Sequence, residues 1–190
     1  NDYACCIQCG HEVLINSGRQ TYIINETLTS DIITRNSFLD RYKNSFVSIK
    51  RDSKDLNLLD IGSASGKFIH DNKDKYKNTL GLEVTPECIE FSRKVLNVKV
   101  IEDISQLELN IDIATAFHTF EHIPIVTLKN ILGGLASIEG NSLEIIVSVP
   151  NASSLQYWLL GKNFAYYDVP NHIHQFSSSS LDKLMQRYGF

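Results

Sequence analysis

The sequence predicts an α/β fold in which helices cover both faces of an open, mostly parallel sheet. From residue 56 onward, short apolar runs alternate with segments of helical periodicity. Strands that alternate with helices in this way form parallel sheets within three layers. The runs are apolar nearly throughout, as expected of strands that are buried on both faces. With 190 residues, 43% of them hydrophobic, the chain can bury the core of one domain with a small appendage.

The order of the elements follows from the same periodicities. We expect strands at residues 56–61, 79–84, 98–102, 111–117 and 143–149, and helices at residues 30–50, 66–76, 86–96, 127–138, 153–160 and 180–188. Thr85 and Pro86 suit the N-cap and the first turn of a helix. Residues 1–28 are irregular, with a hairpin and a group of cysteines. We therefore divide the chain into an N-terminal appendage, residues 1–28, and a main domain, residues 29–190.

Composition excludes several classes of protein. The formal net charge is -4, whereas a general nucleic-acid binder shows a basic surface. Apolar runs are too short for a membrane span, and no signal peptide opens the chain. The cysteine spacing is not that of a secreted disulfide framework, so we expect a cytoplasmic protein. The oligomeric state does not follow from these features.

The strongest motif joins the first strand of this series to the helix after it and reads LLDIGSASGKF over residues 58–68. Small residues at 62–66 allow a tight turn and a close approach to a ligand, at the sheet edge where such folds bind ligands. The dinucleotide fingerprint would need glycines in place of Ala64 and Lys67. Residues 58–68 also lack the residue spacing of a P-loop and of a nucleophile elbow. The loop therefore indicates a nucleoside-like ligand without a diphosphate.

Acidic residues follow the next two strands. Glu83 ends the second strand, where a carboxylate can accept hydrogen bonds from both ribose hydroxyls. Asp103 follows the third strand and can face an adenine edge. Taken alone, each acidic residue is better explained as a solvent-exposed residue at the end of a strand than as a ligand-binding residue. Their placement after successive strands of one sheet favours ligand binding.

These segments resemble the class I S-adenosylmethionine-dependent methyltransferases. Residues 59–66 match the first motif of that family, and residues 81–83 match its acidic strand end. Residues 117–124 are similar to the loop after its fourth strand. Residues 149–151 and 168–177 resemble the branch that contains ubiquinone-type O-methyltransferases.

The resemblance covers about residues 56–190 and implies a Rossmann-like three-layer sandwich that methylates a small-molecule acceptor. The family sheet ends with two strands that would follow Phe190, so either the chain is truncated or the sheet is completed otherwise. The resemblance implies a role for Glu83 at the ribose and for Asp103 and Ile104 at the adenine. The residues that it implies for S-adenosylmethionine binding are Asp60, Gly62, Ser63, Ala64, Gly66, Glu83, Val84, Asp103, Ile104, Phe117 and His118.

Three histidines, His122, His172 and His174, are candidates for a catalytic base. An ordinary imidazole titrates near 6.5, which suits removal of a proton from a hydroxyl. O-methylation is therefore favoured over C-methylation, with N-methylation left open. The alternative is that these histidines are structural. His118 and His122 also match the H-x-x-E-H motif of zinc proteases, but His118 directly follows a strand, so the two are not expected to share a helical face.

The aromatic residues Trp158, Phe164, Tyr166 and Tyr167 favour core packing over a lid on the acceptor.

The N-terminal cysteines resemble half of a zinc ribbon, as found in some sugar C-methyltransferases. Cys6 and Cys9 form a C-x2-C knuckle, with Cys5 and His11 close by in the sequence. A structural zinc site needs four ligands, usually two such pairs, and the second pair is missing. Zinc bound through Cys6 and Cys9, free thiols, and ligands supplied by a partner are the alternatives.

Two rival functions fit the same fold. A nicotinamide-dependent oxidoreductase is disfavoured by the spacing of the glycine-containing loop. A non-catalytic module that kept the cofactor site would retain the same loop residues, so the motif alone does not separate it from an enzyme.

Overall fold

The fold is given by a computed structural model that describes residues 3–6, 11–14, 53–138, 143–164 and 171–190. The chain divides into two compact units. The first, which we call the sheet unit, comprises residues 23–117 and 137–147. The second, which we call the histidine unit, comprises residues 1–22, 118–136 and 148–190. The helix predicted at 30–50 and the second half of the predicted N-terminal hairpin lie outside the described residues.

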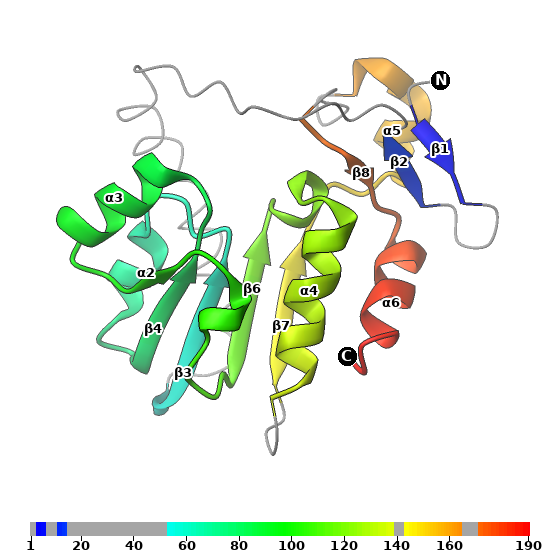
Figure 1. Cartoon of the computed structure of the whole chain (residues 1–190). Coiled ribbons are helices and arrows are strands. Elements are labelled where there is room, and N and C mark those ends of the chain that lie inside the picture. Colours follow the sequence, from blue (N-terminus) through cyan, green and yellow to red (C-terminus); the bar gives the residue numbers. More distant parts are fainter. Residues whose placement is uncertain (1–2, 7–10, 15–52, 139–142, 165–170) are drawn as a thin grey trace. The chain divides into compact units, whose positions relative to one another are not determined.

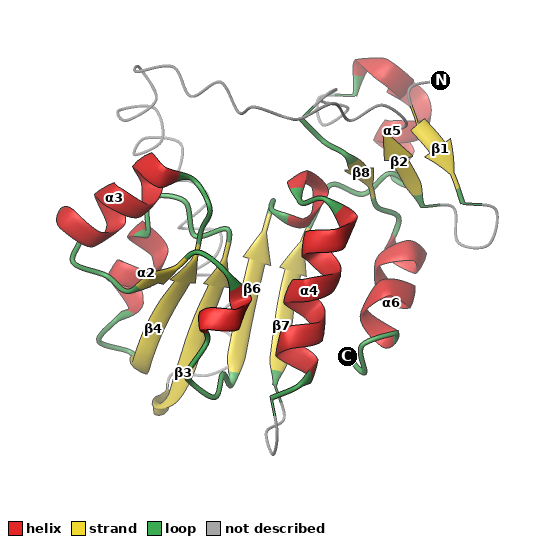
Figure 2. Ribbon diagram, in the orientation of Figure 1, coloured by secondary structure: helices red, strands yellow, loops and turns green. Residues whose placement is uncertain are grey.

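The sheet unit is built around a five-stranded sheet with the order β5-β4-β3-β6-β7 (Figure 1). Its strands are β3 (Ser53–Ile61), β4 (Tyr76–Leu82), β5 (Val100–Ile101), β6 (Ile113–Phe117) and β7 (Glu144–Ser148). β3 pairs in parallel with β4 and β6, and β4 pairs in parallel with β5. Figure 2 shows the arrows of β3, β4, β6 and β7 pointing the same way. The carboxyl ends of these strands therefore lie along one edge, where Rossmann-like folds bind ligands.

Two helices pack on this sheet through one apolar cluster. Phe68 and Ile69 of α2 (Lys67–Asn72) and Ile89 of α3 (Pro86–Lys94) are buried in it. They meet Leu58 of β3 and its register partner Ile113 of β6. Burial of each such side chain stabilises the fold by about 1.5–3 kcal/mol. This packing fixes the loop that joins β3 to α2 at both of its ends.

The histidine unit combines a small sheet with several short helices. Strands β1 (Tyr3–Cys5), β2 (Glu12–Leu14) and β8 (His174–Gln175) form the antiparallel sheet β1-β2-β8. The helical elements are η2 (Phe120–His122), α4 (Ile125–Ala136), α5 (Leu155–Leu160), η3 (Gly161–Asn163) and α6 (Ser178–Gln186). Serine side chains at 154 and 177 accept backbone hydrogen bonds at the starts of α5 and α6.

The predicted order of strands and helices from residue 56 onward is confirmed, but several bounds differ. β3 begins at Ser53 because Ser53 pairs with Tyr76 of β4, so the strand includes polar residues that the apolar pattern had excluded. The helix predicted at 66–76 ends at Asn72, whose side-chain amide donates to the carbonyl of Phe68 at 2.8 Å. Thr85 precedes α3 as predicted, yet its side chain makes no capping hydrogen bond.

Helix α5 presents apolar side chains at its surface. Trp158 is 77% exposed, which contradicts the prediction that it belongs to the core. Phe164 is half-buried and packs edge-on against Tyr157, with ring centroids 5.7 Å apart. Tyr166 and Tyr167 lie outside the described residues. In the part of the chain that is described, every helix is too short or too polar to cross a membrane.

Candidate cofactor loop and histidine cluster

The loop between β3 and α2 turns through three left-handed residues. Gly62, Ala64 and Gly66 have φ angles of 69°, 48° and 75°. Glycine adopts such angles freely, whereas for Ala64 the conformation costs about 1 kcal/mol. The amides of Gly62 and Ser63 both donate to the carbonyl of Leu82, at 2.8 and 3.2 Å. The predicted cofactor loop is therefore bonded to the end of the neighbouring strand β4.

The Glu83 carboxylate holds this loop at a defined position. Its Oε2 accepts a hydrogen bond from the backbone N–H of Ala64 at 2.8 Å. Its Oε1 accepts from the N–H groups of Val84 and Thr85 at 2.8 and 2.9 Å. The side chain is only 8% exposed, and a carboxylate has about four acceptor positions. Beyond these three hydrogen bonds, one acceptor position on Oε2 is left that suits a ribose hydroxyl.

Gly81 and Gly66 have no room for a side chain, because neighbouring serine side chains lie too close to them. A Cβ added to Gly81 of β4 would lie 2.4 Å from the Ser63 hydroxyl oxygen, and one added to Gly66 would lie 2.7 Å from that of Ser92. Both distances are shorter than real Cβ atoms show. The sequence motif predicts Gly66 in the loop, whereas no separate role was predicted for Gly81. A glycine two positions before the acidic strand end was the available signal.

Asp60 lies at the end of β3 and is completely buried. Its carboxylate accepts a hydrogen bond from the hydroxyl of Thr115 on β6 at 2.7 Å, across the register pair Asp60 and Thr115. Asp60 was predicted as a cofactor-site residue from the sequence, whereas Thr115 was not. The sequence feature that could have identified Thr115 is that it is the single polar residue in the otherwise apolar strand β6.

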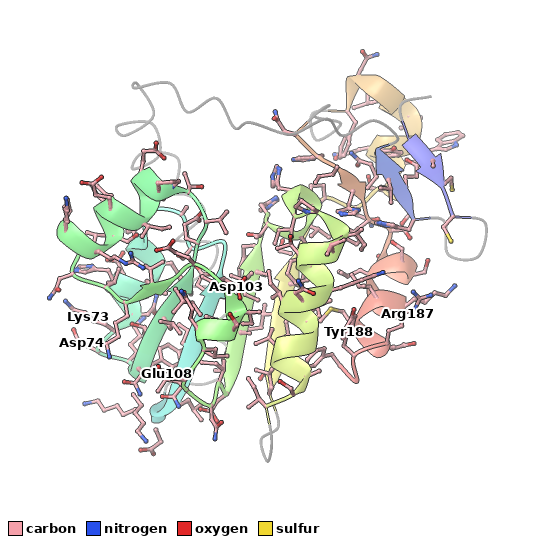
Figure 3. All side chains as sticks on the ribbon, in the orientation of Figure 1. Lys73, Asp74, Asp103, Glu108, Arg187 and Tyr188 are labelled. Carbon is pink, nitrogen blue, oxygen red and sulfur yellow. The ribbon has the colours of Figure 1, made fainter. Side chains whose placement is uncertain are left out.

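Val84, predicted to bind the cofactor, lies after β4, and Asp103 and Ile104, predicted for the adenine, lie after β5. Val84 is 72% exposed. Asp103 is exposed and precedes η1 (Ile104–Gln106), where its carboxylate accepts from the N–H of Ser105 at 2.8 Å (Figure 3). Hydrogen bonding from the side chain and the backbone of Ser105 holds the pKa of Asp103 below its usual value. Asp103 is therefore an anionic acceptor at neutral pH.

The histidine unit brings together two of the three predicted base candidates. His122 and His172 have ring centroids 4.6 Å apart and lie next to Glu121. The backbone also joins the two segments, since the N–H of Ile173 donates to the carbonyl of Glu121 at 2.8 Å. Glu121 is 1% exposed, and its role was missed, because nothing in the sequence distinguishes a buried acid in this loop from an exposed one.

His174 lies apart from this pair, in a second histidine contact. Its Nε2 is 2.9 Å from the carbonyl of Ile123, and its Nδ1 is 3.1 Å from Nε2 of His11. Burial lowers the pKa of His174. Burial and the nearby His174 lower the pKa of His11 to about 4. In the neutral pair, His174 donates to the carbonyl and accepts from His11, so both of its nitrogens are engaged within the protein.

The H-x-x-E-H match does not correspond to a protease helix. His118 has a φ of 52° and lies outside η2, which contains His122. The two histidines do not share a helical face, as the sequence predicted. Phe117 ends β6 and is buried, and His118 follows it directly.

The cysteine knuckle is described only in part. Cys5 and Cys6 are exposed and form no disulfide with another described residue, whereas Cys9 lies outside the described residues. Zinc binding by Cys6 and Cys9 stays a prediction.

A Rossmann-like sheet whose first loop is held by a strand-end carboxylate defines an α/β protein that binds a nucleoside cofactor. Comparison with known proteins defines it further. Residues 27–190 match the family model of the methyltransferase domain, and the chain belongs to this family. It is an S-adenosylmethionine-dependent methyltransferase. The match decides against the two rival functions, the nicotinamide-dependent oxidoreductase and the non-catalytic module.

Solved structures share the fold. A methyltransferase from Archaeoglobus fulgidus is 19% identical with a TM-score of 0.65, and the match covers 87% of this chain and 75% of that one. Magnesium protoporphyrin IX methyltransferase from Synechocystis PCC 6803, solved with bound S-adenosylhomocysteine, is 16% identical with a TM-score of 0.62, over 88% and 78% of the two chains. A possible histamine N-methyltransferase from Thermotoga maritima is 20% identical with a TM-score of 0.57, over 86% and 78%. No curated protein matches in sequence.

Proposed function

We propose that this enzyme methylates an oxygen atom of a small-molecule acceptor, with S-adenosylmethionine bound by the loop after β3 and by Glu83. The observation that carries the cofactor half of this proposal is the buried Glu83 carboxylate. It is bonded to the loop at Ala64 and retains a free acceptor position. One ribose hydroxyl of a nucleoside suits that acceptor.

The residues around Glu83 fit the remaining parts of the cofactor. The exposed Val84 side chain offers an apolar surface to a purine ring, and Ile104 offers a second one. Anionic Asp103 accepts hydrogen bonds, which suits an adenine amino group. Gly62, Ser63 and Gly66 keep side-chain bulk away from the loop. We assign Phe117 and His118, which end β6 and follow it, to the methionine portion.

Bound S-adenosylmethionine supplies a methyl group that is already activated by a sulfonium. The acceptor oxygen forms a bond to this methyl carbon as the carbon–sulfur bond breaks, and the bonding pair stays on sulfur. The protein has to orient the acceptor in line with that bond and to exclude water. A hydroxyl acceptor must also lose its proton.

His122 and His172 are the groups that we propose for handling this proton. They lie together, whereas His174 uses both ring nitrogens within the protein. A positioned proton acceptor accelerates such a step by about 100-fold or more. Two adjacent imidazoles favour an oxygen acceptor over a carbon acceptor, which is why we rank C-methylation second.

Ligand titration followed by turnover tests the proposal. We expect S-adenosylhomocysteine to raise the melting temperature in a concentration-dependent manner, because a ligand that binds the folded state stabilises it. NAD should leave the melting temperature unchanged. With S-adenosylmethionine and a panel of small phenols, alcohols and amines, S-adenosylhomocysteine should form with hydroxyl compounds. Stabilisation by NAD alone, or turnover only with amines, would overturn the proposal.

A further inference from the structure

Glu121, His122 and His172 form a compact group of potential metal ligands. One ligand atom from each side chain lies within 4.8 Å of the others. Glu121 and His172 are buried, with 1% and 7% of their surfaces exposed, and His122 is half-buried. The group spans two segments of one compact unit, η2 and the residues before β8.

Both carboxylate oxygens of Glu121 are buried, and neither has a hydrogen-bond partner among the residues that the structure describes. The ring nitrogen Nδ1 of His118 lies 3.4 Å from Oε1. A buried carboxylate without donors is costly, because nothing replaces the water that it has lost. A cation bound between Glu121 and the two imidazoles removes this cost.

The contact of His122 with the backbone indicates the tautomer of its ring. Its Nδ1 is 2.9 Å from the carbonyl oxygen of Asn171, and a carbonyl can only accept, so Nδ1 carries the hydrogen. The lone pair is then on Nε2. Histidines that bind metals commonly donate their other ring N–H to a carbonyl or carboxylate in this way.

We propose that Glu121, His122 and His172 bind one divalent first-row transition metal ion, with Zn²⁺ preferred over Mg²⁺. Two imidazoles and one carboxylate suit Zn²⁺, Mn²⁺ or Fe²⁺, whereas Mg²⁺ prefers oxygen ligands and keeps its water. Zinc bonds of about 2.0–2.2 Å place neighbouring ligand atoms roughly 3.3 Å apart. Small side-chain movements therefore suffice to close the site around an ion.

Three protein ligands leave a coordination position open, as in catalytic zinc sites. An acceptor hydroxyl bound there would have a lower pKa and would release its proton to solvent more readily. This role rests on the proposed function. His122 and His172 would then act as metal ligands in place of the proton acceptors proposed above.

Metal binding is tested on the whole chain without S-adenosylmethionine, so that its outcome is independent of methyl transfer. Cys5, Cys6 and Cys9 are first replaced by Ser, which removes the other candidate zinc ligands. We expect this protein to retain about one Zn²⁺ per chain after dialysis. Glu121→Gln and His172→Ala should each weaken Zn²⁺ binding at least tenfold, and His70→Ala on α2 should not. With Co²⁺, the visible absorption of a low-coordinate site should appear and be lost in His172→Ala.

Two results would overturn the proposal: less than about a tenth of an equivalent of Zn²⁺ bound, or binding that is unchanged in both variants. A stabilising effect of S-adenosylhomocysteine on the same samples confirms that they are folded. It also separates a failed metal site from a failed cofactor site.

Discussion

The carboxylate of Glu83 accepts the backbone N–H of Ala64 at 2.8 Å, which joins the end of β4 to the loop after β3. The same carboxylate accepts the amides of Val84 and Thr85 at the start of α3. One buried side chain thus fixes two loops at the carboxyl edge of the sheet. The cofactor site is therefore organised before any ligand arrives, which lowers the entropic cost of binding.

Replacing Glu83 by Gln should weaken S-adenosylhomocysteine binding tenfold or more and destabilise the fold by about 1–3 kcal/mol. The amide has one acceptor oxygen, and its NH₂ group would face backbone donors. Isothermal titration calorimetry and urea unfolding measure the two effects. Glu87→Gln in the first turn of α3 is the matched control, since it too removes one carboxylate charge, but from an exposed side chain. Equal affinities for the two variants would contradict the role of Glu83.

Gly81→Ala should impair the cofactor loop although residue 81 lies in a strand. The new Cβ would come within 2.4 Å of the Ser63 hydroxyl oxygen and 2.9 Å of its Cβ, so the loop must shift. We expect a loss of about 1–3 kcal/mol in stability, as for other overpacked sites, together with weaker S-adenosylhomocysteine binding. Thermal unfolding with and without ligand measures both.

The control for this change is Gly133→Ala in α4. There a Cβ meets only a Tyr188 ring carbon at 3.9 Å, an ordinary contact (Figure 3). Alanine is also the better helix former, by about 1 kcal/mol. Gly133→Ala should therefore be neutral or stabilising. If both alanine variants behave alike, steric contact at Gly81 is not the cause.

Thr115→Val should leave the buried Asp60 carboxylate without its hydroxyl donor while conserving side-chain shape. Loss of a hydrogen bond to a buried charged group costs about 1–3 kcal/mol, measured by urea unfolding. Thr115→Ser retains the hydroxyl and should recover most of the loss. Should valine be tolerated as well as serine, the 2.7 Å bond between Thr115 and Asp60 contributes little to the fold.

The cofactor loop and Glu83 could be predicted from the sequence because their signals are local. Gly62, Gly66 and the acid that ends the next strand are short-range patterns set by backbone conformation and strand order. The start of β3 at Ser53 could not be predicted, since it depends on pairing with Tyr76 of β4. The contacts of the histidines also depend on tertiary structure. His172 lies next to Glu121 and His122, whereas His174 of β8 contacts His11 of the neighbouring segment.

Cys88 on α3 should be unreactive toward iodoacetamide in the folded protein at pH 8. Burial, with smaller contributions from the charges of Glu83 and Glu87, raises the pKa of its thiol from the usual 9.0 to about 11. The reactive species is the thiolate, so both low exposure and low ionisation protect it. Peptide mapping after alkylation should show rapid labelling of the exposed Cys5 and Cys6 and labelling of Cys88 only in urea.

The raised pKa of the Cys88 thiol also makes the stability of the protein depend on pH. Between pH 9 and about 11 the unfolded chain releases the Cys88 proton while the folded chain retains it. Protons are then bound more tightly by the folded state, so the free energy of unfolding falls as the pH rises through this window. A Cys88→Ala variant lacks this contribution and should show a flatter pH dependence between pH 9 and 11 in urea titrations. Labelling of Cys88 at the rate of Cys5 in the native protein, or pH profiles that coincide for the two proteins, would show that the thiol ionises normally in the fold.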